Sequence, residues 1–125
     1  MAHLESRLCI ALNDRWMRTY PEYKNCLLHV PNGAHLAGNA GQRARLMARL
    51  KAEGLRPGAS DYFIAVPRGV YHGMWLEVKA GRNKPAKNQL EWLDTMTNNG
   101  NIAKWGAGMD ECWSMIEKYM EQNDD

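Results

Sequence analysis

The stretch DYFIAV at residues 61–66, followed by MWLEVK at residues 74–79, decides the fold of this chain. Both are short runs of apolar, aromatic and β-branched residues, which are typical of β-strands. The connection between them contains Pro67, Gly69 and Gly73, residue types that favour turns. The sequence therefore predicts a β-hairpin whose strands are largely buried.

Three charged residues lie inside this apolar hairpin. Asp61 opens the first strand, and Glu77 and Lys79 lie in the second. If the turn is centred on Gly69, Asp61 pairs with Glu77, and directly opposed side chains have Cβ atoms about 4.5–5.5 Å apart. Because two carboxylates repel each other at that distance, the pattern favours a divalent metal between them and a hydrolytic site. Taken alone, the three residues also fit ordinary strand-edge acids with a lysine partner.

The composition describes one globular domain over residues 1–125. The chain has 125 residues and is 45% hydrophobic, enough for a single core. No apolar run reaches the roughly 18 residues of a membrane span, and the N-terminus does not resemble a secretory signal. We therefore expect no membrane partner and a cytoplasmic location. Cys9, Cys26 and Cys112 lack metal-binding or disulfide spacing, which predicts free thiols.

Charge is unevenly distributed along the chain. The formal net charge is +2, but residues 108–125 carry −5, so the remainder carries +7. The basic body favours an anionic partner. The acidic end is predicted to be a helix with a solvated face, followed by a tail.

The remaining pattern predicts helices and short strands in alternation. Pro21 ends the first helix, Gly54 ends the second, and Pro85 lies in the first turn of the third. This order describes an α/β domain with a small mixed sheet flanked by helices. The predicted helices are 4–19, 40–53, 85–98 and 110–120, and the predicted strands are 26–30, 61–66, 74–79 and 102–105, with a turn at Pro31, Asn32 and Gly33.

The spacing of residues 58–61 (GASD), residues 77–79 (EVK) and Gln89 resembles the PD-(D/E)xK nuclease superfamily. Within it the chain resembles the VRR-NUC family, the virus-type replication-repair nucleases. The likeness continues on both sides and spans nearly the whole chain. It implies a restriction-endonuclease-like core. The flanking matches are Glu5 in an early helix, the Pro-Asn turn at 31–32, the basic helix 40–53 and Gln89-Leu90-Glu91-Trp92.

The resemblance also implies a metal site. Asp61 and Glu77 would bind Mg²⁺ or Mn²⁺, together with the backbone carbonyl of Val78, since hard oxygen ligands suit these ions. Glu5 would complete the site through the metal or its waters. A single acid near a helix start is also a favourable helix-dipole residue, so both interpretations of Glu5 stay open.

Lys79 and Gln89 have implied roles beside the metal. Lys79 would orient or deprotonate the attacking water, or stabilise negative charge on the phosphate. Gln89 would steady Lys79 and that water, although glutamine is also an ordinary helix former.

Basic residues are expected to contact DNA phosphates, both on the helix 40–53 and around the site. A solvated helix is the alternative for the first group. The residues are Arg43, Arg45, Arg49, Arg68, Arg82, Lys84 and Lys87.

Together these features predict a metal-dependent DNA endonuclease like the stand-alone, phage-encoded members of the family. No base-reading module is visible in the sequence, so recognition by DNA shape is expected, with four-way (Holliday) junctions as the preferred substrate. Symmetric cutting of two strands calls for a homodimer. Two alternatives remain: a catalytically silent DNA-binding domain, and a nuclease acting on flaps, nicks or duplex ends.

Overall fold

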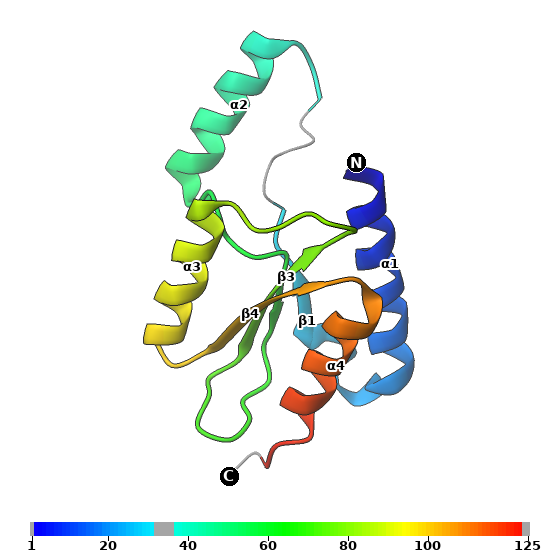
Figure 1. The fold of residues 1–125 in the computed structure, drawn as a ribbon. Coiled ribbons are helices and arrows are strands. Elements are labelled where there is room, and N and C mark those ends of the chain that lie inside the picture. The colour runs from blue at the N-terminus through cyan, green and yellow to red at the C-terminus, as the bar shows by residue number, and fades with distance from the viewer. Residues whose placement is uncertain (1, 32–36, 124–125) are drawn as a thin grey trace.

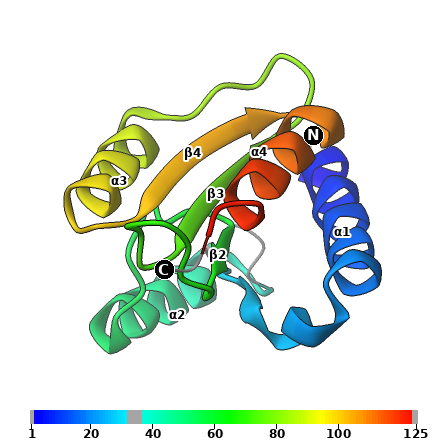
Figure 2. The ribbon, with the colours of Figure 1, turned by 90° about the horizontal axis from the view of Figure 1, so that it is seen from below.

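The computed structural model of the protein describes residues 2–31 and 37–123. Its centre is a four-stranded sheet in the order β1-β2-β3-β4, with helices on both faces (Figure 1, Figure 2). Strand β2 is antiparallel to both β1 and β3, and β4 is parallel to β3. The predicted α/β class with a small mixed sheet is confirmed. The strands are β1 (Leu27–His29), β2 (Tyr62–Ile64), β3 (Met74–Lys79) and β4 (Ile102–Ala107).

Helices α1 and α4 cover one face of the sheet and α3 covers the other (Figure 2). No helix in the described ranges is both long and apolar enough to cross a lipid bilayer. The order of elements agrees with the sequence, except that the short 3-10 helix η1 was not predicted. The helices are α1 (Ala2–Thr19), η1 (Pro21–Cys26), α2 (Ala40–Glu53), α3 (Lys87–Asn98) and α4 (Met109–Met120).

The core lies between the sheet and the pair α1 and α4. Alternate residues of β3 point into it, and Leu76 and Val78 are fully buried against Leu12 and Trp16 of α1 and Ile116 of α4. Burying side chains of this size stabilises the fold by about 1.5–3 kcal/mol each. The intervening residues of β3 point to the opposite face, where α3 lies.

The hairpin register agrees with the prediction. Tyr62 pairs with Leu76 and Ile64 pairs with Met74, so extending the register by one residue places Asp61 opposite Glu77. Strand β2 is shorter than the predicted 61–66, because regular pairing with β3 stops at Ile64 before Pro67. Asp61 lies just outside β2, although its carbonyl still accepts a hydrogen bond from the Val30 amide at 2.8 Å.

The predicted helix boundaries are accurate for α2 but not for the start of α3. Helix α2 has the predicted bounds, since the Asn39 side chain accepts from the Gln42 amide and Gly54 adopts a left-handed φ of 120°. Helix α3 begins at Lys87, so placing Pro85 inside it was wrong. Of the predicted turn, Asn32 and Gly33 lie outside the described residues, as do Asp124 and Asp125 of the acidic tail.

Candidate active site

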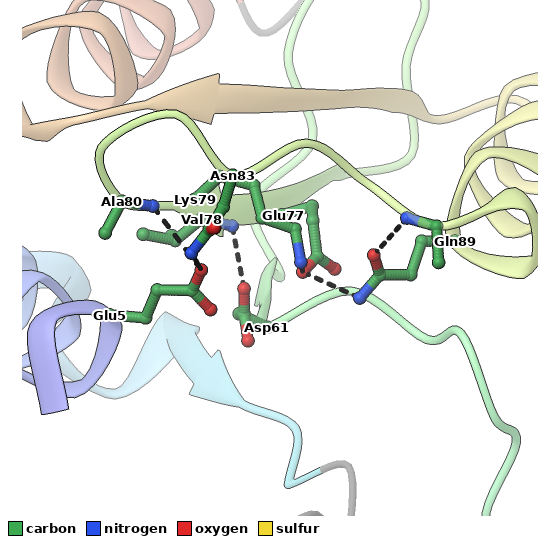
Figure 3. A network of polar contacts seen from close by, with 9 residues as sticks. Glu5, Asp61, Glu77, Val78, Lys79, Ala80, Asn83 and Gln89 are labelled. Carbon is green, nitrogen blue, oxygen red and sulfur yellow. Dashed lines mark hydrogen bonds and ion pairs between the residues drawn. The ribbon is translucent and has the colours of Figure 1, made fainter. Parts of the chain in front are cut away.

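The predicted acidic residues lie close together at the carboxyl-terminal end of β3, where β3 extends beyond its last pair with β2 (Figure 3). Glu77 and Lys79 belong to β3, and Asp61 precedes β2. Glu5 comes from the first turns of α1 and Gln89 from the first turn of α3. Four elements distant in sequence therefore contribute side chains to one site.

The Asp61 side chain continues the hydrogen bonding of β3 beyond the end of β2. Its Oδ2 accepts a hydrogen bond of 2.7 Å from the Val78 amide. The regular ladder between β2 and β3 ends one residue away, so the carboxylate replaces a backbone acceptor. In a strand the amide and carbonyl of one residue point to the same edge. The Val78 carbonyl therefore points to the edge that carries Asp61.

Glu77 is a charged residue held inside the protein. Its side chain is only 3% exposed, and its Oε2 lies 3.4 Å from Lys79 Nζ and accepts from Gln89 Nε2 at 3.2 Å. Its second oxygen, Oε1, is buried and has no hydrogen-bond partner among the described residues. A buried carboxylate oxygen without a partner is costly, and a bound cation would remove that cost.

The two acids perturb each other. Burial, and after it the nearby Asp61, raise the pKa of Glu77 to about 8, although Lys79 acts in the opposite direction. Burial also raises the pKa of Asp61, partly offset by the hydrogen bond from Val78. Without a cation, the pair therefore holds a proton more tightly than two solvated carboxylates.

Lys79 is held on the same face as Glu77. The side chain is 11% exposed and pairs with the Glu77 carboxylate. Its ammonium group therefore lies next to the buried acid, on a side chain that is still slightly exposed to solvent. This position suits a cation that contacts a phosphate oxygen or a water molecule at the site.

Glu5 reaches the site but faces the turn after β3. Its Oε2 accepts from the Ala80 amide at 3.4 Å and from Asn83 Nδ2 at 3.2 Å. Within the described ranges, no three acidic, histidine or cysteine side chains gather closely enough to hold a metal ion. Glu5 thus lies beside the pair Asp61 and Glu77, and its role through the metal or its waters stays a prediction.

These donors fit a hard divalent cation. Asp61 and Glu77 supply carboxylate oxygens, one of them the buried Glu77 Oε1 that lacks a partner, and Val78 adds a carbonyl at the same edge. Oxygen donors of this kind suit Mg²⁺ and Mn²⁺. The absence of a sulfur or imidazole donor from this set argues against a zinc-type arrangement.

Gln89 acts on the acid and on its own helix. Its Nε2 donates to Glu77, and its Oε1 accepts the Ala86 amide at 2.8 Å, where α3 begins. The sequence predicts that Gln89 steadies Lys79 and the attacking water. The structure places its amide on the carboxylate with which Lys79 pairs, so Gln89 reaches Lys79 through Glu77.

Three residues beside the site were not predicted. Asn83 binds Glu5. The Tyr62 hydroxyl donates to the Cys9 carbonyl at 2.9 Å, and burial raises the pKa of the Cys9 thiol to about 11, with Asp61 as a further cause. A cysteine one helical turn after Glu5 was a usable signal for Cys9. Nothing local marks Asn83, because its contact joins residues far apart in sequence.

Arg68 does not lie beside the site, contrary to the prediction. It is buried in the turn between β2 and β3, at the opposite end of β3 from Lys79. Its Nε donates to the Met120 carbonyl at 3.2 Å, and its guanidinium lies 5.3 Å from the centre of the Tyr23 ring. Arg68 therefore ties the hairpin to α4 and η1.

The other predicted basic residues are exposed. Arg82 and Lys84 lie in the loop after β3, and Lys87 begins α3, within 4.0 Å of Glu91. Arg82 and Lys84 flank Asn83 in the chain, and Asn83 donates to Glu5 of the site. The remaining arginines, Arg43, Arg45 and Arg49, lie on α2.

Comparison with solved structures finds the same fold in another protein. No protein-family model matches the sequence, and no curated protein matches it. Among solved structures, a chain described as "VRR_NUC domain protein" superposes with a TM-score of 0.81 and 22% sequence identity. The match covers 97% of this chain and 91% of that chain. The resemblance seen in the sequence is thus confirmed for the fold.

Proposed function

We propose that this chain is a metal-dependent nuclease of the VRR-NUC type that hydrolyses DNA phosphodiester bonds. One observation carries the proposal: Glu77 presents a buried carboxylate oxygen without a partner, beside Asp61 and Lys79. An arrangement so costly for stability is typical of functional sites. The shared fold with a VRR_NUC domain protein supports the same conclusion.

Asp61, Glu77 and the Val78 carbonyl would hold Mg²⁺ or Mn²⁺. Such an ion lowers the pKa of a nearby water and offsets negative charge on the scissile phosphate. Binding requires both carboxylates to lose their protons, so the raised pKa of Glu77 makes metal affinity increase with pH up to about 8.

The other side chains then have distinct tasks. Lys79 Nζ donates to a phosphate oxygen or orients the attacking water in line with the leaving group. Gln89 fixes the rotamer of Glu77, since it donates to Oε2 from the rigid start of α3. Glu5, anchored by Ala80 and Asn83, accepts a hydrogen bond from water at the outer side of the site.

The DNA would be recognised by shape. Arg82 and Lys84 in the loop after β3, and Lys87 at the start of α3, are exposed and would contact phosphates of a nearby strand. We propose branched DNA as the substrate, with four-way junctions preferred, and a homodimer that cuts two strands symmetrically.

Cleavage of a panel of labelled DNAs tests the proposal. The panel contains a four-way junction, a matched linear duplex, a flap and a nicked duplex, each incubated with Mg²⁺, Mn²⁺ or EDTA. We expect paired nicks in the junction with either metal and none with EDTA. Cutting of the other structures as well would discard junction preference only. Binding without any cleavage would identify a silent DNA-binding domain.

A further inference from the structure

Helix α2 stands apart from the core. None of its residues is buried, and it extends away from the sheet beyond the start of α3 (Figure 1). Isolated helices of about this length are marginal in water. Both ends of α2 are capped, by Asn39 with Gln42 and by Gly54. The helix is thus stabilised locally while most of its surface remains available to a partner.

One face of α2 carries a basic hollow. Arg45 and Arg49 are exposed and lie one turn apart, and Gln42 lies one turn before Arg45. The helix contains a single acid, Glu53. These side chains border an open hollow of about 560 Å³ whose lining comprises Ala37, Gly38, Gln42, Arg45, Leu46 and Arg49.

The base of α2 is fixed beside the active site. Residues 54–60 connect the helix to Asp61, and Gly58 packs closely on the start of α3. A Cβ at Gly58 would lie 2.7 Å from the Asn88 carbonyl oxygen, one residue before Gln89. The segment that joins α2 to Asp61 therefore packs on the start of α3, next to Gln89.

We propose that α2 binds the sugar-phosphate backbone of the DNA substrate, away from the scissile phosphate. We call this protruding helix, residues 40–53, the arm. This inference rests on the proposed function and adds a second contact on the flanking duplex. Two guanidinium groups bordering one hollow suit a phosphate, which they bind through paired, charge-assisted hydrogen bonds. Self-association through the same face is disfavoured, because a two-fold axis would bring its arginines together.

DNA binding measured in EDTA tests the arm without cleavage. Fluorescence anisotropy with a labelled junction and a labelled duplex gives the affinity over a series of salt concentrations. The test variant is R45Q/R49Q, since glutamine keeps helix propensity. The matched control is R18Q/K118Q, which removes the same charge from exposed positions in the last turns of α1 and α4.

We expect R45Q/R49Q to weaken binding on the order of tenfold to a hundredfold for both DNAs. The slope of log affinity against log salt should fall by about 1.8, because each lost phosphate contact removes about 0.9. The control should change neither quantity. Equal effects of the two double variants would overturn the inference, since only overall charge would then matter.

The same variants separate this inference from the proposed function. Wild-type protein that binds DNA but never cuts it, with binding lost in R45Q/R49Q, would keep the arm and discard the nuclease. A variant that binds and cuts like wild type would discard the arm alone. A change in sedimentation behaviour without a change in DNA affinity would assign α2 to contact between copies and overturn the inference.

Discussion

At the scale of single residues, Glu77 shows the conflict between stability and chemistry. Its carboxylate is buried, paired on one oxygen with Lys79 and Gln89, and unpaired on the other. A glutamine of the same shape would cost the metal-free fold less. Only a carboxylate would bind a divalent cation well, so the atom that destabilises the metal-free fold is also the one that the proposed reaction requires.

The metal-free protein should lose stability as pH rises. The pKa of Glu77 is near 8 in the fold and near its ordinary value of 4.5 in the unfolded chain. Between those values the folded state binds more protons, so the free energy of unfolding decreases with increasing pH. E77Q removes this effect and should be more stable than wild type at pH 8, on the order of 1–3 kcal/mol, and nearly equal at pH 4.5.

Urea unfolding in EDTA at pH 4.5 and pH 8 measures this difference. The matched control is E91Q, because the Glu91 side chain is 66% exposed and its replacement should leave the pH dependence unchanged. A constant difference between E77Q and wild type at both pH values would contradict the assigned pKa.

Addition of metal should reverse the order of stability. Mg²⁺ or Mn²⁺ binds only the folded state, so it should raise the melting temperature of the wild type and of E91Q. The increase should be larger at pH 8 than at pH 6, since Glu77 must lose its proton. D61N and E77Q should show little increase. An equal increase in all four proteins would show that the metal binds elsewhere.

At the scale of elements, the conformation of the loop between α2 and β2, and its packing on α3, depend on one glycine. Gly58 has φ of 88° and lies against the start of α3, whereas Gly81 has φ of 59° and open space around it. Alanine is strained at both positions, but only at Gly58 does it also meet backbone.

We therefore expect G58A to destabilise the protein by about 1–3 kcal/mol more than G81A. Because this loop positions Asp61, cleavage should also fall more in G58A than in G81A. Thermal unfolding and cleavage rates of the two variants check both effects. Equal stability would mean that the loop is free to move away from Asn88.

Much of the secondary structure could be predicted from the sequence. The hairpin register followed from the turn around Gly69, and the bounds of α2 followed from Gly54 and the run of helix formers. The start of α3 was missed, because the Ala86 amide is satisfied by the Gln89 side chain, a choice that Pro85 does not reveal.

The close approach of the charged hairpin residues was predictable, because strand alternation and hairpin register follow from the local sequence. Asp61, Glu77 and Lys79 met as expected on those grounds. The position of Arg68 was not predictable, since its partners Met120 and Tyr23 are distant in sequence. Only the packing of α4 and η1 against the hairpin determines it.

At the scale of the whole molecule, the proposed homodimer assigns one active site to each strand of a junction. Mixed dimers that contain one wild-type chain and one E77Q chain should therefore nick a single strand, while wild-type dimers make paired nicks. Purification of the mixed species by two different affinity tags, followed by product mapping on a labelled junction, checks this. Paired nicks from the mixed dimer would contradict one site per strand.

Cleavage rates of wild type, E77Q and E91Q on the four-way junction with Mg²⁺ or Mn²⁺ test most directly whether the buried acid pair is the catalytic site. Binding measured in EDTA verifies that all three proteins still hold the DNA. We expect E77Q to lose at least about 10²-fold in rate, while E91Q stays within a factor of about two. Cleavage by E77Q at the wild-type rate would contradict the assignment of the buried acid pair as the catalytic site.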